Sequence, residues 1–105
     1  MKFLSNKLLA LLFLTTVNLS FAQDSFILNY ENVDIKKVTQ DIAQFSKKTI
    51  ILDPRVKGKI TIYSNANLNR RQVWDVYLRT IQVNGFSAIT ENGFVRIVPE
   101  NEATR

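Results

Sequence analysis

The sequence predicts a small α+β domain in which two amphipathic helices alternate with short β-strands. Residues 35–45 and 73–81 carry apolar side chains at helical spacing, and the runs around them alternate apolar and polar side chains as strands do. An Asn-Gly pair between two such runs, Asn92-Gly93, is a strong hairpin pattern. From residue 25 onward we therefore expect the order strand, helix, strand, strand, helix, strand, strand.

The first 22 residues have the features of a secretory signal peptide. Two lysines precede an apolar run over residues 8–17, and the small residues Ser20 and Ala22 stand three before and one before a cleavage site. We expect cleavage between Ala22 and Gln23, which leaves 12 basic and 9 acidic residues and lowers the formal net charge from +5 to +3. The alternative is an uncleaved anchor helix, although a membrane span needs about 20 apolar residues.

A first strand is expected at residues 25–30, with Phe26 and Leu28 on one face and Ile27 and Asn29 on the other. A strand at the amino end of a domain is often a sheet edge, to which a partner adds its own strand. We therefore expect these four residues to bind a partner, with Ile27 and Asn29 directed away from the core. An internal strand is the alternative.

A first helix is expected to begin after Asp34, a good N-cap because its carboxylate accepts from the free N–H groups of the first turn. Apolar residues then recur at intervals of three, four and three positions, which predicts one buried stripe. The stripe comprises Ile35, Val38, Ile42 and Phe45. The helix is expected to fray over residues 46–48, where cations suit its negative carboxyl end.

Residues 49–63 form the centre of the predicted fold. We expect two strands here, residues 49–52 and 59–63, that face each other across a turn. Asp53-Pro54 ends the first run because proline lacks an N–H, and Gly58 provides a second break.

A second helix is expected after Asn69, because Gln72 stands in the capping-box position three residues later. Asn84-Gly85 is a typical helix stop. The wide apolar face of this helix comprises Val73, Trp74, Tyr77, Leu78 and Ile81.

The carboxyl-terminal part is predicted to be a hairpin followed by a tail. Residues 86–90 and 94–98 alternate on either side of the Asn-Gly turn. Pro99 ends the second strand, and residues 100–105 are expected to be a polar tail or linker.

The composition argues against catalysis and against metal binding. The chain contains no cysteine and no histidine, which excludes disulfides, thiolate chemistry, the commonest metal ligand and the usual general base. Its nine acidic residues are not paired on a helix face, and its three glycines stand too far apart for a phosphate-binding loop. Asp53 precedes a proline and is interpreted as a turn residue rather than a catalytic acid. We expect neither an enzyme nor a bound metal or cofactor.

Basic residues cluster at several places in the chain. These clusters lack the interleaved aromatic residues of a nucleic-acid-binding patch, and an exported protein rarely meets nucleic acid. We interpret them as solvated helix faces and expect no nucleic-acid partner. Trp74 is interpreted as a core residue rather than a ligand platform, because it belongs to an apolar stripe. The clusters are Lys36-Lys37, Lys47-Lys48, Arg70-Arg71 and the set Arg55, Lys57 and Lys59.

Several ordered runs between residues 25 and 100 point to a known family. They are Phe26-x-Leu-Asn-Tyr, Val33-Asp34-Ile35, Thr49-Ile-Ile-Leu-Asp-Pro-Arg-Val-Lys-Gly-Lys-Ile-Thr, Leu68-Asn69 and Gln82-Val-Asn-Gly-Phe. The sequence resembles the amino-terminal domain of outer-membrane secretins, above all the secretin of type II secretion, the family's protein D. The Asp-Pro-x-Val-x-Gly-Lys-Ile-Thr and Val-Asn-Gly-Phe runs are its most specific parts. A weaker resemblance extends to the signalling domain of TonB-dependent receptors, which shares the fold.

The resemblance implies two helices packed between a mixed three-stranded sheet and a two-stranded antiparallel hairpin. It implies a periplasmic location at the mouth of an outer-membrane ring of identical secretin subunits. The implied role is a docking module for the inner-membrane protein C of the same system through strand-edge pairing, which agrees with the interpretation of residues 25–30. Secreted proteins entering the channel are a further implied partner.

Secretins continue through further periplasmic domains into a membrane channel, whereas this sequence ends at Arg105. We therefore expect a fragment, a truncated gene product or a single domain, with the signal peptide at residues 1–22 and the domain proper at residues 23–99. Two other functions stay open. One is a TonB-receptor signalling domain with an anti-sigma partner, and the other is a small secreted hydrolase or inhibitor. Genomic context separates these three functions.

Overall fold

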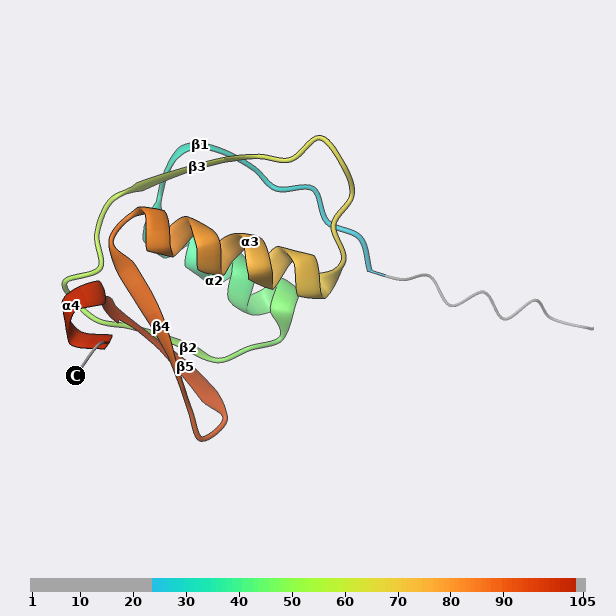
Figure 1. Cartoon of the computed structure of the whole chain (residues 1–105). Helices are drawn as coiled ribbons and strands as arrows, with labels where there is room; N and C mark the ends of the chain where they lie inside the picture. Colours follow the sequence, from blue (N-terminus) through green and yellow to red (C-terminus); the bar gives the residue numbers. More distant parts are fainter. Residues whose placement is uncertain (1–23, 104–105) are drawn as a thin grey trace, which may run out of the picture.

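Two helices pack side by side between two small β-sheets in the computed structural model, which describes residues 24–103 (Figure 1). β1 and β3 lie on one side of the helices, and β2, β4 and β5 lie on the other (Figure 1). The predicted α+β fold class is confirmed. The expected signal segment and its cleavage site between Ala22 and Gln23 lie outside the described residues. The elements in order are β1 (Asn29–Asp34), α2 (Ile35–Ser46), β2 (Ile50–Leu52), β3 (Lys59–Tyr63), α3 (Arg70–Val83), β4 (Phe86–Glu91), β5 (Phe94–Pro99) and α4 (Glu100–Ala103).

The three-stranded sheet has the order β2-β5-β4 and contains both parallel and antiparallel pairs. β2 runs parallel to β5, with Ile50 opposite Val95. β4 and β5 are antiparallel and form the predicted hairpin around the Asn-Gly turn. Gly93 has a φ of 81°, a conformation that glycine adopts without the penalty that a Cβ brings.

The expected pairing of residues 49–52 with residues 59–63 is wrong. β3 pairs antiparallel with β1, with Tyr30 opposite Ile62, and β2 belongs to the other sheet. The turn at Asp53, where the Val56 N–H donates to the Asp53 carbonyl at 2.9 Å, carries the chain from one sheet toward the other. The two-stranded sheet is therefore not a hairpin, because α2 and β2 stand between its strands in the sequence. Alternation within a strand indicates which face is buried, but it does not indicate which strand lies beside it.

The first strand begins and ends later than expected. Phe26 forms an isolated bridge with Leu68, and β1 proper starts at Asn29 and continues to Asp34. A bulge between Tyr30 and Val33, with Asn32 at a φ of 55°, lets the pairing with β3 continue beyond Tyr30.

Both predicted helix starts are confirmed. The Asp34 side chain accepts from the Lys36 N–H at 2.8 Å, and Asn69 forms a complete capping box with Gln72. α2 ends at Ser46, and its C-cap residue Lys47 has a φ of 53°, in the left-handed region in which many helices terminate.

The core lies between the facing sides of α2 and α3 and the two sheets. Its fully buried residues include Ile35, Val38 and Ile42 from α2, Val73, Tyr77 and Ile81 from α3, and Ile60, Ile97 and Val98 from the strands. Trp74 and Leu78, which the sequence placed on the same apolar face, are only partly buried. The expected tail also differs, because Glu100–Ala103 form α4, whose Glu102 pairs with Arg55.

Candidate functional site

The main chain of residues 26–29 has one bonded side and one open side. The Phe26 N–H donates to the Leu68 carbonyl at 2.8 Å, the Leu68 N–H donates back at 2.7 Å, and the Ser64 N–H donates to the Leu28 carbonyl at 2.9 Å. Because main-chain groups in antiparallel pairs alternate in direction, Ile27 and Asn29 turn their N–H and C=O groups the opposite way. Within residues 24–103 the sheet has no strand on that side, so this edge is unpaired.

Side chains alternate along the same segment as predicted. Ile27 is 59% exposed and Asn29 is exposed, whereas Leu28 is only 1% exposed. Phe26 is half-buried and stacks on Phe45 with ring centroids 4.8 Å apart. Of the four residues predicted to bind a partner, Ile27 and Asn29 therefore have exposed side chains and outward main-chain groups, while Phe26 and Leu28 anchor the strand.

An ion pair also fixes the start of this segment. Asp24 forms an ion pair with Arg70 at the start of α3. The same Arg70 donates through Nε to the Phe45 carbonyl at 2.8 Å, which ties the end of α2 to both. The open edge therefore belongs to a segment whose conformation is already fixed, so binding of a partner strand would not carry the entropic cost of ordering it.

An aromatic side chain that the sequence analysis did not single out extends this surface. Tyr63 lies opposite Asn29 in the β1–β3 pair, is 71% exposed, and donates through its hydroxyl to Glu31 at 3.0 Å. Opposed residues share one face of a sheet, so Ile27, Asn29, Glu31 and Tyr63 form one outer surface, called here the β1 face. The sequence does contain a pattern that indicates this position, because Tyr63 is an aromatic residue on the polar face of the alternating run 59–63.

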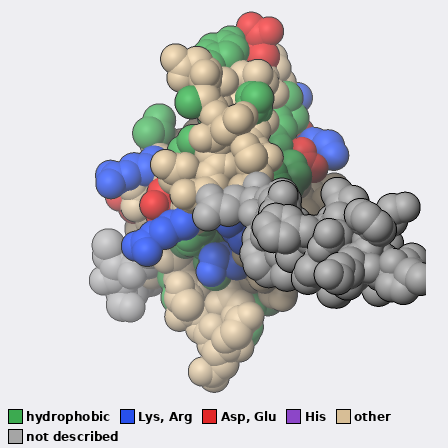
Figure 2. Space-filling model, turned by 90° about the vertical axis from the view of Figure 1, so that its right-hand side faces the viewer, with side chains coloured by type: hydrophobic (Ala, Val, Ile, Leu, Met, Phe, Trp, Pro, Cys, Tyr) green, Lys and Arg blue, Asp and Glu red, His purple; other side chains and the backbone are tan. Residues whose placement is uncertain are grey.

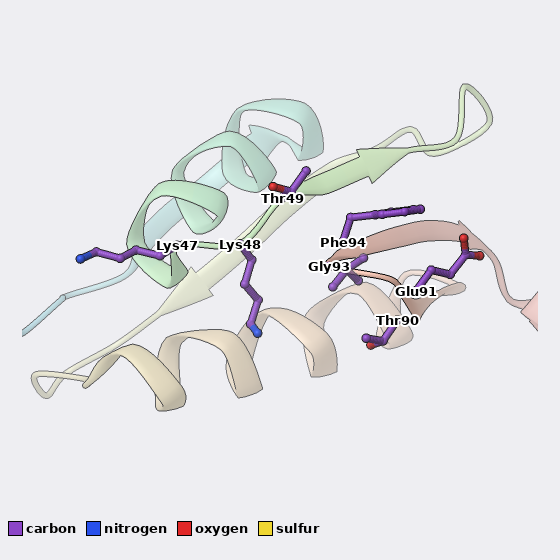
Figure 3. A pocket seen from close by; sticks show the side chains of 8 residues that line it. Lys47, Lys48, Thr49, Thr90, Glu91, Gly93 and Phe94 are labelled. Carbon is purple, nitrogen blue, oxygen red and sulfur yellow. The ribbon is translucent and has the colours of Figure 1, made fainter.

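The hollow at the end of α2, formed within residues 24–103, does not bring catalytic groups together. It has a volume of about 270 Å³ and lies between the end of α2 and the tip of the β4–β5 hairpin, and its acid, Glu91, is paired with Arg96 at 2.9 Å (Figure 3). Hydrogen bonds from Arg55 hold the pKa of Asp53 down at about 2, so this carboxylate stays ionised as a turn residue and is no proton donor near neutral pH.

Among residues 24–103, no three His, Cys, Asp or Glu side chains are grouped as metal ligands. No helix in that part of the chain is both long and apolar enough to cross a membrane.

A family model described as the GspD-like N0 domain matches residues 28–97. The chain belongs to the GspD-like N0 domain family. The N0 domain is the amino-terminal domain that the sequence resemblance indicated, so the predicted membership in the type II secretin family is confirmed. The alternative of a TonB-receptor signalling domain gains no support.

Individual relatives agree with the family match. The chain is 32% identical to the secretin XcpQ of Pseudomonas aeruginosa over 76 residues, which are 72% of this chain and 12% of that protein. The solved N0 domain of the type II secretin from enterotoxigenic Escherichia coli superimposes with a TM-score of 0.68 at 29% identity, covering 75% of this chain and 99% of that one. The chain thus corresponds to an N0 domain and spans 12% of the length of the full secretin.

A further solved structure is the Klebsiella pneumoniae type II secretion outer membrane complex, which contains PulD, PulS and the PulC HR domain. It matches at 32% identity with a TM-score of 0.61, over 67% of this chain and 12% of that one.

Proposed function

We propose that this N0 domain docks the inner-membrane protein C of a type II secretion system by accepting a strand at the open edge of residues 27–29. The observation that carries the proposal is the unpaired main chain of Ile27 and Asn29 beside exposed side chains of the β1 face. The similar Klebsiella pneumoniae complex contains the PulC HR domain together with the secretin PulD, which supports a protein C partner.

The chemistry of this edge fits strand addition. Two N–H and two C=O groups at alternate positions provide main-chain hydrogen bonds, and the side chains between them provide specificity. Covering the Ile27 side chain, now 59% exposed, adds apolar burial at about 25 cal/mol per Å². The role needs no catalytic group, so we propose a non-enzymatic docking domain.

The proposal also covers the export, location and assembly of the domain. We propose export by the segment of residues 1–22 with cleavage between Ala22 and Gln23, a periplasmic position, and assembly with further secretin subunits in a ring. Amino-terminal sequencing of the chain from periplasmic extract checks the cleavage site. The partners in this proposal are protein C and further secretin copies.

The test is a titration of the chain with the periplasmic region of protein C from the same system. Ile27→Asp places an unpaired charge in the interface and is expected to weaken binding more than about tenfold. Ile51→Asp is the matched control, since Ile51 is a 46% exposed isoleucine on the other sheet, and its effect should stay within about twofold. Equal affinities of the wild-type chain and Ile27→Asp, with both folded by circular dichroism, would refute the edge assignment.

Ile27→Pro probes the main chain in the same titration. No backbone hydrogen bond of the described part of the chain involves the Ile27 N–H, so proline removes a group that only a partner would use. We expect unchanged thermal stability together with weakened binding. Retained binding would show that the partner does not use the Ile27 N–H, and would argue against a strand paired along this edge.

A further inference from the structure

Two pairs of basic residues that are distant in the sequence meet at one end of the helix layer. Lys47 and Lys48 follow α2, and Arg70 and Arg71 begin α3. Figure 2 views the molecule from this end and shows Lys and Arg side chains grouped across the middle of the face. Three of these four residues, Lys48, Arg70 and Arg71, line one hollow of about 570 Å³.

The floor of this hollow is apolar. Trp74 and Leu78, both partly buried residues of α3, pack against the core and also line the hollow, so the indole that was expected in the core is only partly covered by it. The Lys48 side chain reaches from the end of α2 toward α3 (Figure 3), and its Nζ lies 5.0 Å from the centre of the Trp74 ring. Trp74 also contacts Tyr77 of the core, with ring centroids 5.5 Å apart.

Basic side chains outnumber acidic ones around the hollow, and only some of them are paired. Arg70 is committed to Asp24 and to the Phe45 carbonyl, but Lys48 and Arg71 have no ion-pair partner in residues 24–103. Asp75 is the one acidic residue that lines the hollow. The hollow thus combines two cations free for a ligand with an aromatic floor.

A polar group without a partner lies in the same wall. The Ser46 hydroxyl is buried and makes no hydrogen bond within residues 24–103, although Ser46 lines the hollow. Buried hydroxyls in folded proteins nearly always have a partner. The fold within residues 24–103 therefore leaves one polar group of this wall unsatisfied.

We propose that this hollow, called here the Trp74 pocket, binds an acidic peptide segment of a partner protein. Carboxylates of the segment pair with Lys48 and Arg71, and an apolar side chain packs on Trp74 and Leu78. This second docking site is separate from the β1 face and does not depend on protein C binding there.

The shape of the site favours a peptide over other anionic partners. A volume of about 570 Å³ lies within the range of roughly 300–1,000 Å³ typical of ligand pockets, and it accommodates a few side chains. A membrane surface is attracted by protruding basic groups on an exposed face. Single-stranded nucleic acid is bound on a series of stacking aromatic side chains, whereas Trp74 is the one aromatic residue among those that line this hollow.

The single tryptophan also makes the site observable, because intrinsic tryptophan fluorescence of the purified chain comes from Trp74. The probe is the peptide acetyl-Glu-Leu-Glu-Leu-Glu-amide, and the control is the same peptide with glutamine in place of glutamate. We expect a saturable change in fluorescence with the acidic peptide at least about tenfold tighter than the control. Because partly exposed ion pairs are screened, the affinity should fall as salt rises from about 50 to about 300 mM.

Matched double variants locate the site. Lys48→Gln with Arg71→Gln should lower the affinity for the acidic peptide about three- to tenfold, from two exposed charge pairs. Lys57→Gln with Lys59→Gln removes the same charge from exposed residues outside the pocket and should change it less than about twofold. Ile27→Asp should leave peptide binding unchanged, which separates this site from the β1 face.

Three results would overturn the proposal. The first is equal affinity for the acidic and glutamine peptides. The second is an equal loss in both double variants, which would mean that net charge acts without the pocket. The third is tighter binding to vesicles containing phosphatidylglycerol, or to a single-stranded oligonucleotide, than to the acidic peptide, which would assign the site to a membrane or to nucleic acid.

Discussion

Asn29 of β1 lies directly opposite Tyr63 of β3, and both side chains are exposed on the same face of the two-stranded sheet. The Tyr63 hydroxyl donates to Glu31 at 3.0 Å, so the ring is held over the sheet rather than left to rotate freely. A partner strand added beside Ile27 and Asn29 would therefore find an ordered aromatic side chain on the adjacent strand. Tyrosine at such positions provides contact area at low entropic cost.

Tyr63→Ala is expected to weaken protein C binding by about three- to tenfold, because it removes a large exposed side chain from the β1 face. Tyr63→Phe is the control, since it keeps the ring and loses only an exposed hydrogen bond to Glu31. Titration of protein C into both variants measures the difference. If Tyr63→Ala binds as tightly as Tyr63→Phe, the partner contacts the edge without covering β3.

The turn at Asp53 predicts a pH dependence at the acidic end of the range. Hydrogen bonds from the Arg55 side chain and N–H hold the pKa of Asp53 at about 2, below the ordinary value of 3.8. A lowered carboxylate pKa means that the folded state binds the proton less tightly than the unfolded state. The resulting stabilisation is fully present above the ordinary pKa and is lost as the pH falls from about 4 to about 2.

Asp53→Asn tests this pH dependence because asparagine keeps the turn-forming side-chain oxygen but does not titrate. The melting temperatures of the wild-type chain and the variant should differ at pH 7 and converge as the pH approaches 2. A difference that stays constant between pH 7 and pH 2 would show that the carboxylate charge does not stabilise this turn.

Local features of the fold were predictable from the sequence because their chemistry is confined to a few neighbouring residues. The Asp34 and Asn69 caps and the Asn92-Gly93 turn each depend on groups within about four positions. The exposure of Ile27 followed from strict alternation along an extended segment. These elements appear at or within a few residues of the expected positions.

Features that depend on distant parts of the chain were not predictable in the same way. Nothing within residues 59–63 specifies β1 rather than β2 as their neighbour, so the expected pairing was wrong. Likewise, the Trp74 pocket exists because the end of α2 meets the start of α3, more than 20 positions later. Tyr63 was overlooked as a site residue for a similar reason, because its importance depends on its position opposite Asn29.

Gly93→Ala is expected to destabilise the domain by about 1–2 kcal/mol. Gly93 has a φ of 81°, and a Cβ added there would meet no atom within 4 Å, so the cost is one of backbone conformation and not of packing. Gly93→Asn should cost less, because asparagine tolerates the left-handed region better than alanine does. Urea unfolding of the three proteins measures both values, and equal stability of the alanine variant and the wild type would argue against a left-handed residue in this turn.

The buried hydroxyls of Thr39 and Tyr77 lie 2.9 Å apart between α2 and α3, and burial raises the pKa of Tyr77 to about 12. Thr39→Val strands the Tyr77 hydroxyl in the core and is expected to cost about 1–3 kcal/mol of unfolding free energy. Tyr77→Phe should cost less, about 0.5–1.5 kcal/mol, because the threonine hydroxyl then turns to a carbonyl of its own helix. The double variant leaves no orphaned group, so its cost should be smaller than the sum of the two single costs. Urea unfolding of all four proteins at pH 7 closes this cycle, and strictly additive costs would mean that the two hydroxyls do not stabilise each other.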